Sequence, residues 1–359
     1  MIKRTLKKIN KTFYPGRLFF EPEYIILGVN NVCNLHCKMC DVGTQNNETN
    51  FAQNLVGSKP INMPLELFKM IVDQVAASFP MAKIGYAFTE PLIYPSLKDS
   101  LAYAHQNGLE TSVTTNALLL KRKAEDLITG RVKDLYISLD GLEDTHNFIR
   151  GNKRSFQSAI EGIEHIMSFE NAPDVSVFCV ITEWNYSDLE KFAEFFTNFP
   201  IKQLGFLHQN FITKAMADTH NMDYGHICKA TYSNVELTDF SKIDLKVLHR
   251  EIQNVKAGGY NFNLSFSPEI NDIDTLTLYY HKPEIKIGKT CNDLFTNIMI
   301  KTDGTVIPSH GRCYNMPLGN IYRTPLETIW NSKPYANFRK ELVNAGGQFP
   351  ACYRCCSAF

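Results

Sequence analysis

Short apolar runs rich in β-branched residues alternate with longer amphipathic stretches between residues 24 and 208. In the longer stretches apolar residues recur at helical spacing, and start or stop signals bound the segments 64–79, 96–108 and 187–199. The expected strands are 24–29, 82–88, 110–115, 134–140, 175–181 and 201–208. Strands that are apolar on both faces are typical of a buried parallel sheet. The pattern therefore predicts an α/β fold, a partial (β/α)6 barrel, with active groups at the carboxyl ends of its strands.

This alternation stops near residue 209. Residues 209–290 are mixed and aromatic-rich, and we interpret them as a bridge that lines or caps the barrel mouth. The text FTNIMIKTDGTVIPS, from residue 295, predicts a hairpin with its turn at Asp303-Gly304, and a helix is expected over 325–346. The predicted parts are a basic N-terminal arm (1–22), the barrel (23–208), the bridge (209–290) and a small C-terminal α+β domain (291–359).

The overall charge is balanced, with 37 Lys and Arg residues against 37 Asp and Glu residues. We therefore expect no general attraction to nucleic acid. No apolar run approaches the roughly 20 residues of a membrane span, so we expect a soluble cytoplasmic protein. The start, MIKRTLKKINKTFYPGR, is basic and lacks the apolar stretch of a signal peptide. It is expected to be a solvated helix or arm, and the alternative is a surface that attracts an anionic membrane or partner.

The ten cysteines are unevenly distributed. Because disulfides are rare in cytosolic proteins, this clustering of cysteines favours metal binding over disulfide bonds. Three of them, Cys33, Cys37 and Cys40, follow the first expected strand, and five lie between residues 291 and 356. A structural zinc ion would need a fourth ligand near the first three, and His36 is crowded inside the loop. An iron–sulfur cube held by three cysteines would instead leave one iron open to a substrate.

The spacing Cys-x3-Cys-x2-Cys after the first strand of a βα-repeat protein resembles that of the radical S-adenosylmethionine (SAM) superfamily. The resemblance implies that Cys33, Cys37 and Cys40 hold a [4Fe–4S] cluster whose open iron binds the amino and carboxylate groups of SAM. One electron, from an external reductant of flavodoxin or ferredoxin type, then splits SAM into methionine and a 5′-deoxyadenosyl radical. Met39 stands where the family often has an aromatic residue, and its polarizable thioether can cover the same surface.

Later segments resemble further motifs of this family in the expected order. The segment AFTEPLIYP, residues 87–95, resembles the family's Gly-Gly-Glu-Pro, although Phe88 and Thr89 replace the glycines. The resemblance implies that Glu90 accepts a hydrogen bond from the SAM amino group. Asn116 ends the third strand and is expected to contact the same cofactor.

The segment SLDGLEDTHNFIRG, residues 138–151, resembles the fourth-strand motif of the family. It implies Ser138 and Asp140 near the ribose or carboxylate of SAM, and Arg150 as a carboxylate partner. The alternative is that these residues are unrelated helix caps and surface charges. The resemblance covers roughly residues 20–208.

The C-terminal text contains DGTVIP, LGNI and ETIW, and it resembles the SPASM and twitch domains that hold auxiliary [4Fe–4S] clusters. A full SPASM domain has seven cysteines for two clusters, whereas here one cluster is expected. Its expected ligands are Cys291, Cys313, Cys352 and Cys355. Ser309 stands where the family usually has a cysteine, so the second ligand is Cys313 or His310. Cys356 is a spare or a substitute for Cys355, and a structural zinc site is the alternative for the whole tail.

A cluster with four cysteine ligands has no open iron, so its expected role is electron transfer. The single-cluster arrangement resembles the aminoglycoside-pathway alcohol dehydrogenase of the twitch group. We therefore expect an oxidoreductase that oxidises or epimerises a small hydroxylated substrate such as a sugar, aminocyclitol or nucleotide sugar. Too few residues precede the first strand for a winged-helix peptide-recognition domain. The alternatives are a peptide-modifying SPASM maturase, and a non-enzymatic iron–sulfur or zinc module for electron transfer or interaction.

Candidate acid–base residues near the barrel mouth are His208, Asp223 and His226. Cys228 is a candidate hydrogen-atom donor for an epimerase. Each of the four also has a structural interpretation, which for Cys228 is that of a small buried hydrophobic residue.

Overall fold

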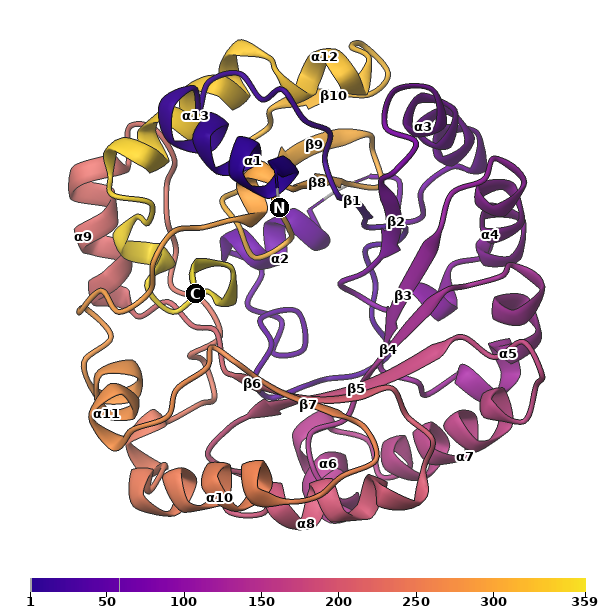
Figure 1. Ribbon diagram of the computed structural model, residues 1–359, viewed down its shortest axis with the longest axis vertical. Coiled ribbons are helices and arrows are strands. Elements are labelled where there is room, and N and C mark those ends of the chain that lie inside the picture. The colour runs from indigo at the N-terminus through magenta and orange to yellow at the C-terminus, as the bar shows by residue number, and fades with distance from the viewer. Residues whose placement is uncertain (1, 58) are drawn as a thin grey trace.

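A computed structural model of the chain describes residues 2–57 and 59–359, and a curved ten-stranded sheet dominates it (Figure 1). The strand order is β10-β9-β8-β1-β2-β3-β4-β5-β6-β7. The sheet bends into an open barrel with most helices outside it, as Figure 1 shows. This confirms the α/β class and the partial barrel predicted from the sequence.

The first six strands run parallel in chain order, each close to a predicted apolar run. They are β1 (Tyr24–Leu27), β2 (Lys83–Tyr86), β3 (Thr111–Thr115), β4 (Asp134–Ser138), β5 (Asp174–Ile181) and β6 (Gln203–His208). Registers such as Ile25 opposite Ile84 keep apolar side chains at the same level of the sheet.

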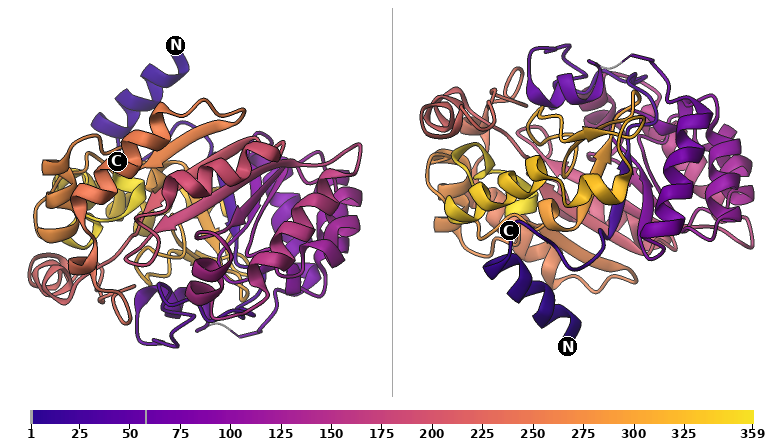
Figure 2. Two further views of the ribbon diagram at one scale, coloured as in Figure 1. Left: turned by 90° about the horizontal axis from the view of Figure 1, so that it is seen from below. Right: turned by 90° about the horizontal axis from the view of Figure 1, so that it is seen from above.

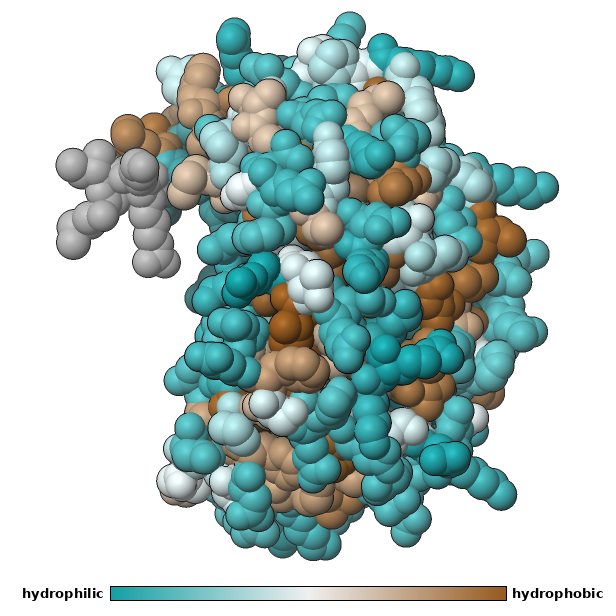
Figure 3. All heavy atoms as spheres, turned by 90° about the vertical axis from the view of Figure 1, so that its right-hand side faces the viewer, coloured by the Kyte–Doolittle hydropathy of each residue, from teal (hydrophilic) through white to brown (hydrophobic). Residues whose placement is uncertain are grey.

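Amphipathic helices cover the outside of these strands. They are α3 (Leu65–Ser78), α4 (Leu97–Gln106), α5 (Leu120–Thr129), α6 (Glu143–Arg150), α7 (Ser155–Met167) and α8 (Leu189–Phe195). In α3 the side chains of Leu67, Phe68, Ile71 and Val75 are buried, and each stabilises the packing by about 1.5–3 kcal/mol. Figure 3 shows the side of the molecule that lies on the right in Figure 1. Its outer surface is largely hydrophilic with separate hydrophobic patches.

The region 209–290 contains a seventh parallel strand, which the sequence interpretation missed. After α9 (Lys214–Tyr224) and α10 (Leu245–Ala257), strand β7 (Asn263–Ser267) pairs with β6, and α11 (Ile273–His281) follows. Only Leu264 and Phe266 are apolar in β7, because it is an edge strand that buries one face. Polar residues at the other positions hid the strand from a search for continuous apolar runs.

The C-terminal region adds three strands to the opposite edge of the same sheet. They are β8 (Asn297–Ile300), β9 (Thr305–Pro308) and β10 (Gly319–Asn320). Strand β8 pairs in parallel with β1, and β9 folds back on β8 through the predicted Asp303-Gly304 turn. Gly304 has φ of +79°, a conformation that glycine adopts without strain.

The remaining helices are α1 (Ile2–Phe13), α2 (Asn50–Leu55), α12 (Leu326–Trp330) and α13 (Lys333–Asn344). Short 3₁₀ turns occupy Pro91–Ile93, Phe196–Asn198, Phe240–Lys242, Asp293–Phe295, Pro350–Cys352 and Cys356–Ala358. The C-terminal segment lies on the side of the barrel where the two ends of the sheet do not meet (Figure 1). Helix α1 projects from the body of the protein (Figure 2).

Candidate active site

A cavity of about 450 Å³ lies at the carboxyl ends of the barrel strands. Its wall is formed by loops that follow different strands, as expected for a barrel of this kind. The wall includes Cys33, Cys37 and Cys40 after β1, Phe88 and Thr89 after β2, Asn116 after β3, Ser138 at the end of β4, and His208 and Gln209 at β6. The structure thus brings together residues from the ends of five different strands.

The three-cysteine loop is held against the end of α6. The backbone amides of His36 and Lys38 donate to the carbonyls of Arg150 and Ile149, at 3.3 and 2.9 Å. Gly151 caps α6 with φ of +66°, and a Cβ atom there would lie 3.0 Å from the His36 carbonyl oxygen. Glycine is therefore required for this close approach. His36 itself is exposed and does not line the cavity.

Arg150 places a fixed positive charge beside this loop. Its Nε donates to the Asp140 carboxylate at 2.5 Å, and its Nη1 lies 3.6 Å from the Cys37 sulfur. Burial raises the pKa of the Cys37 thiol to about 12, and the guanidinium of Arg150 opposes that shift. Asp140 is fully buried, and its second oxygen accepts the Val180 amide at 3.0 Å. Asp140 therefore positions Arg150 from behind the wall.

Glu90 is also behind the wall, with 1% of its surface exposed. One carboxylate oxygen accepts from the Thr115 hydroxyl at 2.7 Å and the Leu92 amide at 3.0 Å, and the other accepts from the Asn116 amide at 2.8 Å. Burial raises the pKa of this carboxyl, while these hydrogen bonds lower it. This geometry fixes the β2 loop to the end of β3. A contact of Glu90 with a SAM amino group stays a prediction.

Phe88 stands where the resembling motif has glycine, and the backbone keeps a glycine-like shape there. Its φ is +66°, in the left-handed region that side chains rarely adopt. The ring lies 6.3 Å from the ring of Phe51 and 6.3 Å from that of His310, centroid to centroid. Neighbouring Asn116 donates to Asn34 at 2.8 Å and lies 3.9 Å from the Cys33 sulfur. Asn116 therefore contacts the cysteine loop directly.

The far wall of the cavity carries polar groups without protein partners among the described residues. The Nδ1 atom of His208 is 2.7 Å from the Tyr280 hydroxyl, and its Nε2 has no partner. Burial lowers the pKa of His208 to about 3, so the imidazole is neutral. Gln209 donates to the Asn234 carbonyl at 2.9 Å, which leaves its side-chain oxygen unpaired.

Arg312 adds a positive charge to this wall. Its guanidinium lies 4.3 Å from the centre of the Phe51 ring, and its Nη1 is buried without a hydrogen-bond partner in the described part of the chain. The sequence reading missed both Gln209 and Arg312. Gln209 had a usable signal, because it directly follows the sixth strand, whereas Arg312 had none beyond its closeness to Cys313.

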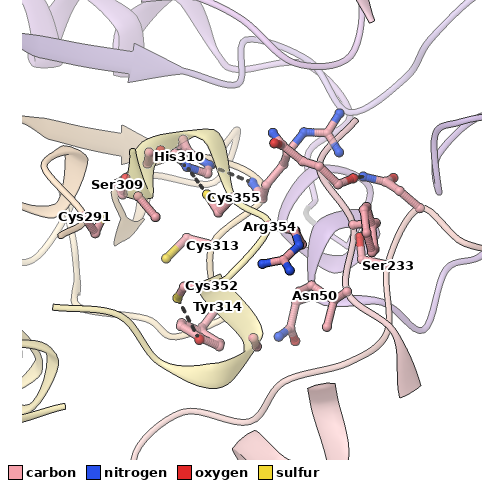
Figure 4. Close-up of a pocket in the computed structure, with 18 residues that line it drawn as sticks. Asn50, Ser233, Cys291, Ser309, His310, Cys313, Tyr314, Cys352, Arg354 and Cys355 are labelled. Carbon is pink, nitrogen blue, oxygen red and sulfur yellow. Dashed lines mark hydrogen bonds between the residues drawn. The ribbon is translucent and has the colours of Figure 1, made fainter. Parts of the chain in front are cut away.

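A second cavity, of about 60 Å³, lies in the C-terminal region (Figure 4). It is lined by all four cysteines expected there, Cys291, Cys313, Cys352 and Cys355. Burial raises the pKa of Cys291, Cys313 and Cys352, so an ionised thiolate needs a bound cation to compensate its charge. The Tyr314 hydroxyl lies 3.2 Å from the Cys352 sulfur.

His310 also lines this cavity, but both of its ring nitrogens have partners. Nδ1 accepts the Arg312 amide at 3.1 Å, and Nε2 lies 2.9 Å from the Ser357 hydroxyl. The free thiol of Cys313 is therefore the better placed of the two alternative ligands. Ser309, in the usual cysteine position, has φ of +59° and is buried.

Cys356 faces the barrel cavity and does not line the smaller one. Asn210 holds it from two sides, because its side-chain amide donates to the Cys356 sulfur at 3.3 Å and its side-chain oxygen accepts the Cys356 amide at 3.0 Å. Consecutive cysteines therefore point into different cavities.

The two cavities adjoin each other. Five residues line both of them: Asn210, Asn234, His310, Arg312 and Ser357. The three-cysteine loop and the four-cysteine group are therefore separated by one shared wall.

The described cysteines form no compact set of ligands for a single metal ion. Within residues 2–57 and 59–359, no three His, Cys, Asp or Glu side chains come together closely enough to hold one metal ion. Thiols spread around a cavity fit the larger set of metal atoms in an iron–sulfur cluster, which cysteines hold from several sides.

Three sequence candidates lie away from both cavities. Asp223 and His226 are exposed near the end of α9. Cys228 is buried, and its sulfur lies 3.7 Å from His220 Nε2. None of the three lines either cavity, so the geometry gives no support to a catalytic role for them.

Comparison with known families supports the two cysteine groups. Residues 28–196 match the Radical SAM superfamily, and residues 291–356 match SPASM, an iron–sulfur cluster-binding domain. The chain is 22% identical over 360 residues to the tungsten-containing aldehyde ferredoxin oxidoreductase cofactor-modifying protein of Pyrococcus furiosus, covering 93% of this chain and 87% of the relative. Two further curated relatives are matched over only 42% and 43% of their own length.

Solved structures share the fold. Streptococcus suis SuiB bound to the precursor peptide SuiA superposes with a TM-score of 0.64 at 16% identity, covering 94% of this chain and 70% of SuiB. Native anSMEcpe with bound AdoMet and Cp18Cys peptide gives a TM-score of 0.58 at 17% identity, covering 88% of this chain and 82% of that structure. None of the helices in the part of the chain that the structure describes has the length and apolar character that a bilayer crossing requires.

Proposed function

Because the chain has a radical SAM domain followed by a SPASM iron–sulfur domain, we propose that it is a radical SAM enzyme that modifies a peptide or protein-borne substrate. The two domains imply a [4Fe–4S] cluster, SAM and auxiliary iron–sulfur binding. When bound, the first cluster would supply the electron that splits SAM into methionine and a 5′-deoxyadenosyl radical, and the auxiliary cluster would accept an electron from the substrate radical. An external one-electron reductant of flavodoxin or ferredoxin type would supply the electron of the SAM-binding cluster in the reducing cytoplasm, and the auxiliary cluster would return its extra electron to a carrier of the same type.

In this proposal the chain's own residues divide into ligands and positioning groups. Cys33, Cys37 and Cys40 would hold the first cluster, and Cys291, Cys313, Cys352 and Cys355 the auxiliary one. Asn116, Ser138 and Arg150 line the barrel cavity and would contact SAM. Glu90 and Asp140 act through Asn116 and Arg150, because both carboxylates are occupied by protein donors.

The observation that carries the proposal is the shared wall between the two cavities. The three-cysteine loop opens on one cavity and the four tail cysteines on the other, and five residues belong to both. A substrate held against that wall would lie between the hydrogen-abstracting site and an electron acceptor. A fully ligated cluster is suited to that acceptor role.

The wall also offers groups that can orient a substrate. The neutral His208 and the free oxygen of Gln209 can exchange hydrogen bonds with amide groups, and Arg312 can pair with a carboxylate. A peptide carries both kinds of group. The likeness to SuiB and anSMEcpe, whose structures contain peptides, supports the same choice at the level of the fold.

A small hydroxylated molecule or a cofactor precursor is the second candidate substrate. The barrel cavity of about 450 Å³ lies within the range of roughly 300–1,000 Å³ of small-molecule sites. The similarity to a cofactor-modifying protein extends over 93% of the chain. Oxidation of such a substrate would lower its mass by two hydrogens, whereas epimerisation would leave the mass unchanged.

The test is anaerobic incubation of the iron-reconstituted protein with SAM and dithionite. We expect methionine and 5′-deoxyadenosine, and neither product from a variant with Cys33, Cys37 and Cys40 changed to alanine. Absence of 5′-deoxyadenosine from the unaltered protein would contradict the enzyme assignment and leave an electron-transfer or interaction module. Candidate peptides and hydroxylated metabolites are then added separately in deuterium-labelled water, and their masses are measured. The class whose mass changes contains the substrate.

A further inference from the structure

The apolar stripe of helix α1 is exposed at the surface of the protein. Leu6, Ile9 and Phe13 recur at spacings of three and four, which places them on one face of the helix. Their exposed fractions are 59%, 45% and 70%. A surface helix of a globular protein normally turns such a stripe toward the core. In α1 the stripe instead remains largely exposed.

Polar contacts fix the position of α1 against the body and the segment that follows it. Lys7 pairs with Glu23 at 2.9 Å, and Lys11 donates to the Asn292 side chain at 3.3 Å. Asn10 is 6% exposed, and its side-chain amide donates to the Arg17 carbonyl at 2.8 Å. These bonds orient the helix, so its apolar stripe remains at the surface.

The apolar surface continues beyond the helix. Tyr14 and Phe19 are 61% and 70% exposed, and their rings contact each other edge to face with centroids 6.5 Å apart. Leu6, Ile9, Tyr14 and Phe19 line one groove between α1 and the body. Single exposed apolar residues need no explanation, but a contiguous group marks an interaction surface. The Tyr14 ring ends in a hydroxyl, which suits a membrane–water interface, and the Phe19 ring adds apolar area beside it.

Charge identifies the occupant of this surface. The first 20 residues contain no Asp or Glu, and they contain Lys3, Arg4, Lys7, Lys8, Lys11 and Arg17. The rest of the chain is correspondingly acidic, since the whole molecule has 37 residues of each sign. A helix that joins an apolar stripe to a basic face is suited to the surface of an anionic bilayer. Helix α1 projects from the body, so a flat surface can reach it (Figure 2).

We propose that helix α1 and the adjoining Tyr14 and Phe19 bind the surface of an anionic lipid bilayer, with the apolar stripe in the headgroup–acyl boundary. The interaction is peripheral and does not depend on the chemistry proposed for the barrel. Its consequence is that the enzyme works at a membrane surface, where substrates attached to lipid or to membrane proteins are concentrated.

Co-sedimentation of the full-length, iron-reconstituted protein with vesicles tests the proposal. We expect binding to vesicles of phosphatidylcholine mixed with phosphatidylglycerol, much weaker binding to phosphatidylcholine alone, and weakening by salt. The Phe13→Asp variant should lose at least about tenfold in partitioning, because it replaces a large apolar side chain in the bilayer boundary with a charged one. Lys8→Glu should also weaken binding, and only to the anionic vesicles.

Met222→Asp is the matched control, because Met222 lies on α9 and is 80% exposed. It should bind anionic vesicles as the unaltered protein does. Circular dichroism and iron content, measured on every variant, show whether each is folded. Equal binding to both vesicle types, no binding to either, or unchanged binding by folded Phe13→Asp would overturn the proposal. The last result would point to a protein partner or to the body of the molecule.

Discussion

The Tyr314 hydroxyl lies 3.2 Å from the Cys352 sulfur, and its alternative acceptor is His220 Nδ1 at 3.4 Å. His220 Nε2 is 2.7 Å from the Cys228 carbonyl oxygen. A carbonyl only accepts, so Nε2 carries the proton of the neutral ring and Nδ1 is an acceptor. The phenol therefore has two acceptors, and a thiolate at Cys352 would be the stronger one because it is charged.

Tyr314→Phe is expected to lower the reduction potential of the auxiliary cluster. A hydrogen bond to a ligating sulfur stabilises the more negative reduced state, so its loss disfavours reduction. A tenfold change in the equilibrium corresponds to about 59 mV for one electron. The measurement is a redox titration followed by electron paramagnetic resonance, in a background with Cys33, Cys37 and Cys40 changed to alanine. Tyr224→Phe, which removes a hydroxyl from the same aromatic group, should leave the potential unchanged.

The cysteine assignment predicts a specific pattern of iron loss. In the same triple-alanine background we expect about four irons per chain from the tail cysteines. A further Cys356→Ala change should preserve this iron, because Cys356 faces the other cavity. A further Cys313→Ala change should remove most of it. The measurement is colorimetric iron analysis. If the Cys313→Ala variant retained its iron and the His310→Ala variant lost it, His310 would be the ligand in place of Cys313.

Asp140→Asn is expected to destabilise the fold by about 3–5 kcal/mol, because it leaves the buried Arg150 guanidinium without its counter-charge. The measurement is urea unfolding of the iron-free chain, followed by circular dichroism. Asp188→Asn provides the comparison, since its pair with Lys191 is exposed and contributes at most about 1 kcal/mol. Similar losses in the free energy of unfolding would show that the buried Asp140–Arg150 pair contributes no more to stability than the exposed pair.

His208 predicts a loss of stability in acid. Its pKa falls from 6.5 to about 3 on folding because the ring is buried. Between these values the unfolded chain binds a proton that the folded chain does not, so stability falls as pH falls. The slope is about 1.4 kcal/mol per pH unit for this one group. The His208→Gln variant should show a shallower dependence between about pH 4 and 6.5 in urea unfolding, and exposed His105→Gln should retain the original one.

The strands that are apolar on both faces, and the order of the motifs along the chain, could be predicted from the sequence. Cys33, Cys37 and Cys40 were placed correctly on the loop after β1, and Asp303-Gly304 at the hairpin turn. Strand β7 was missed because an edge strand buries only alternate residues. The parallel pairing of β8 with β1 could not be inferred, since the two strands lie about 270 positions apart and no local signal links them.

The site was predictable in its positions but less so in its contacts. Glu90 and Asp140 do lie at strand ends, yet their side chains turn into the wall, because each is engaged by donors from neighbouring strands. Spacing along a strand predicts the face of the sheet on which a side chain lies, but it does not predict the hydrogen-bond partner of that side chain. Arg312 escaped notice for the same reason, since its place beside Phe51 depends on how the tail folds back over the barrel.

The pairing of β8 with β1 also limits how such enzymes can be recombined. The outer edge of the first barrel strand is covered by residues 297–300, so a fragment that ended before the hairpin would leave that edge bare and prone to aggregate. A chimera that imports a foreign cluster domain must therefore bring a hairpin matched to the recipient's own first strand. The boundary between the barrel and the cluster domain therefore lies inside a single sheet, between β1 and β8.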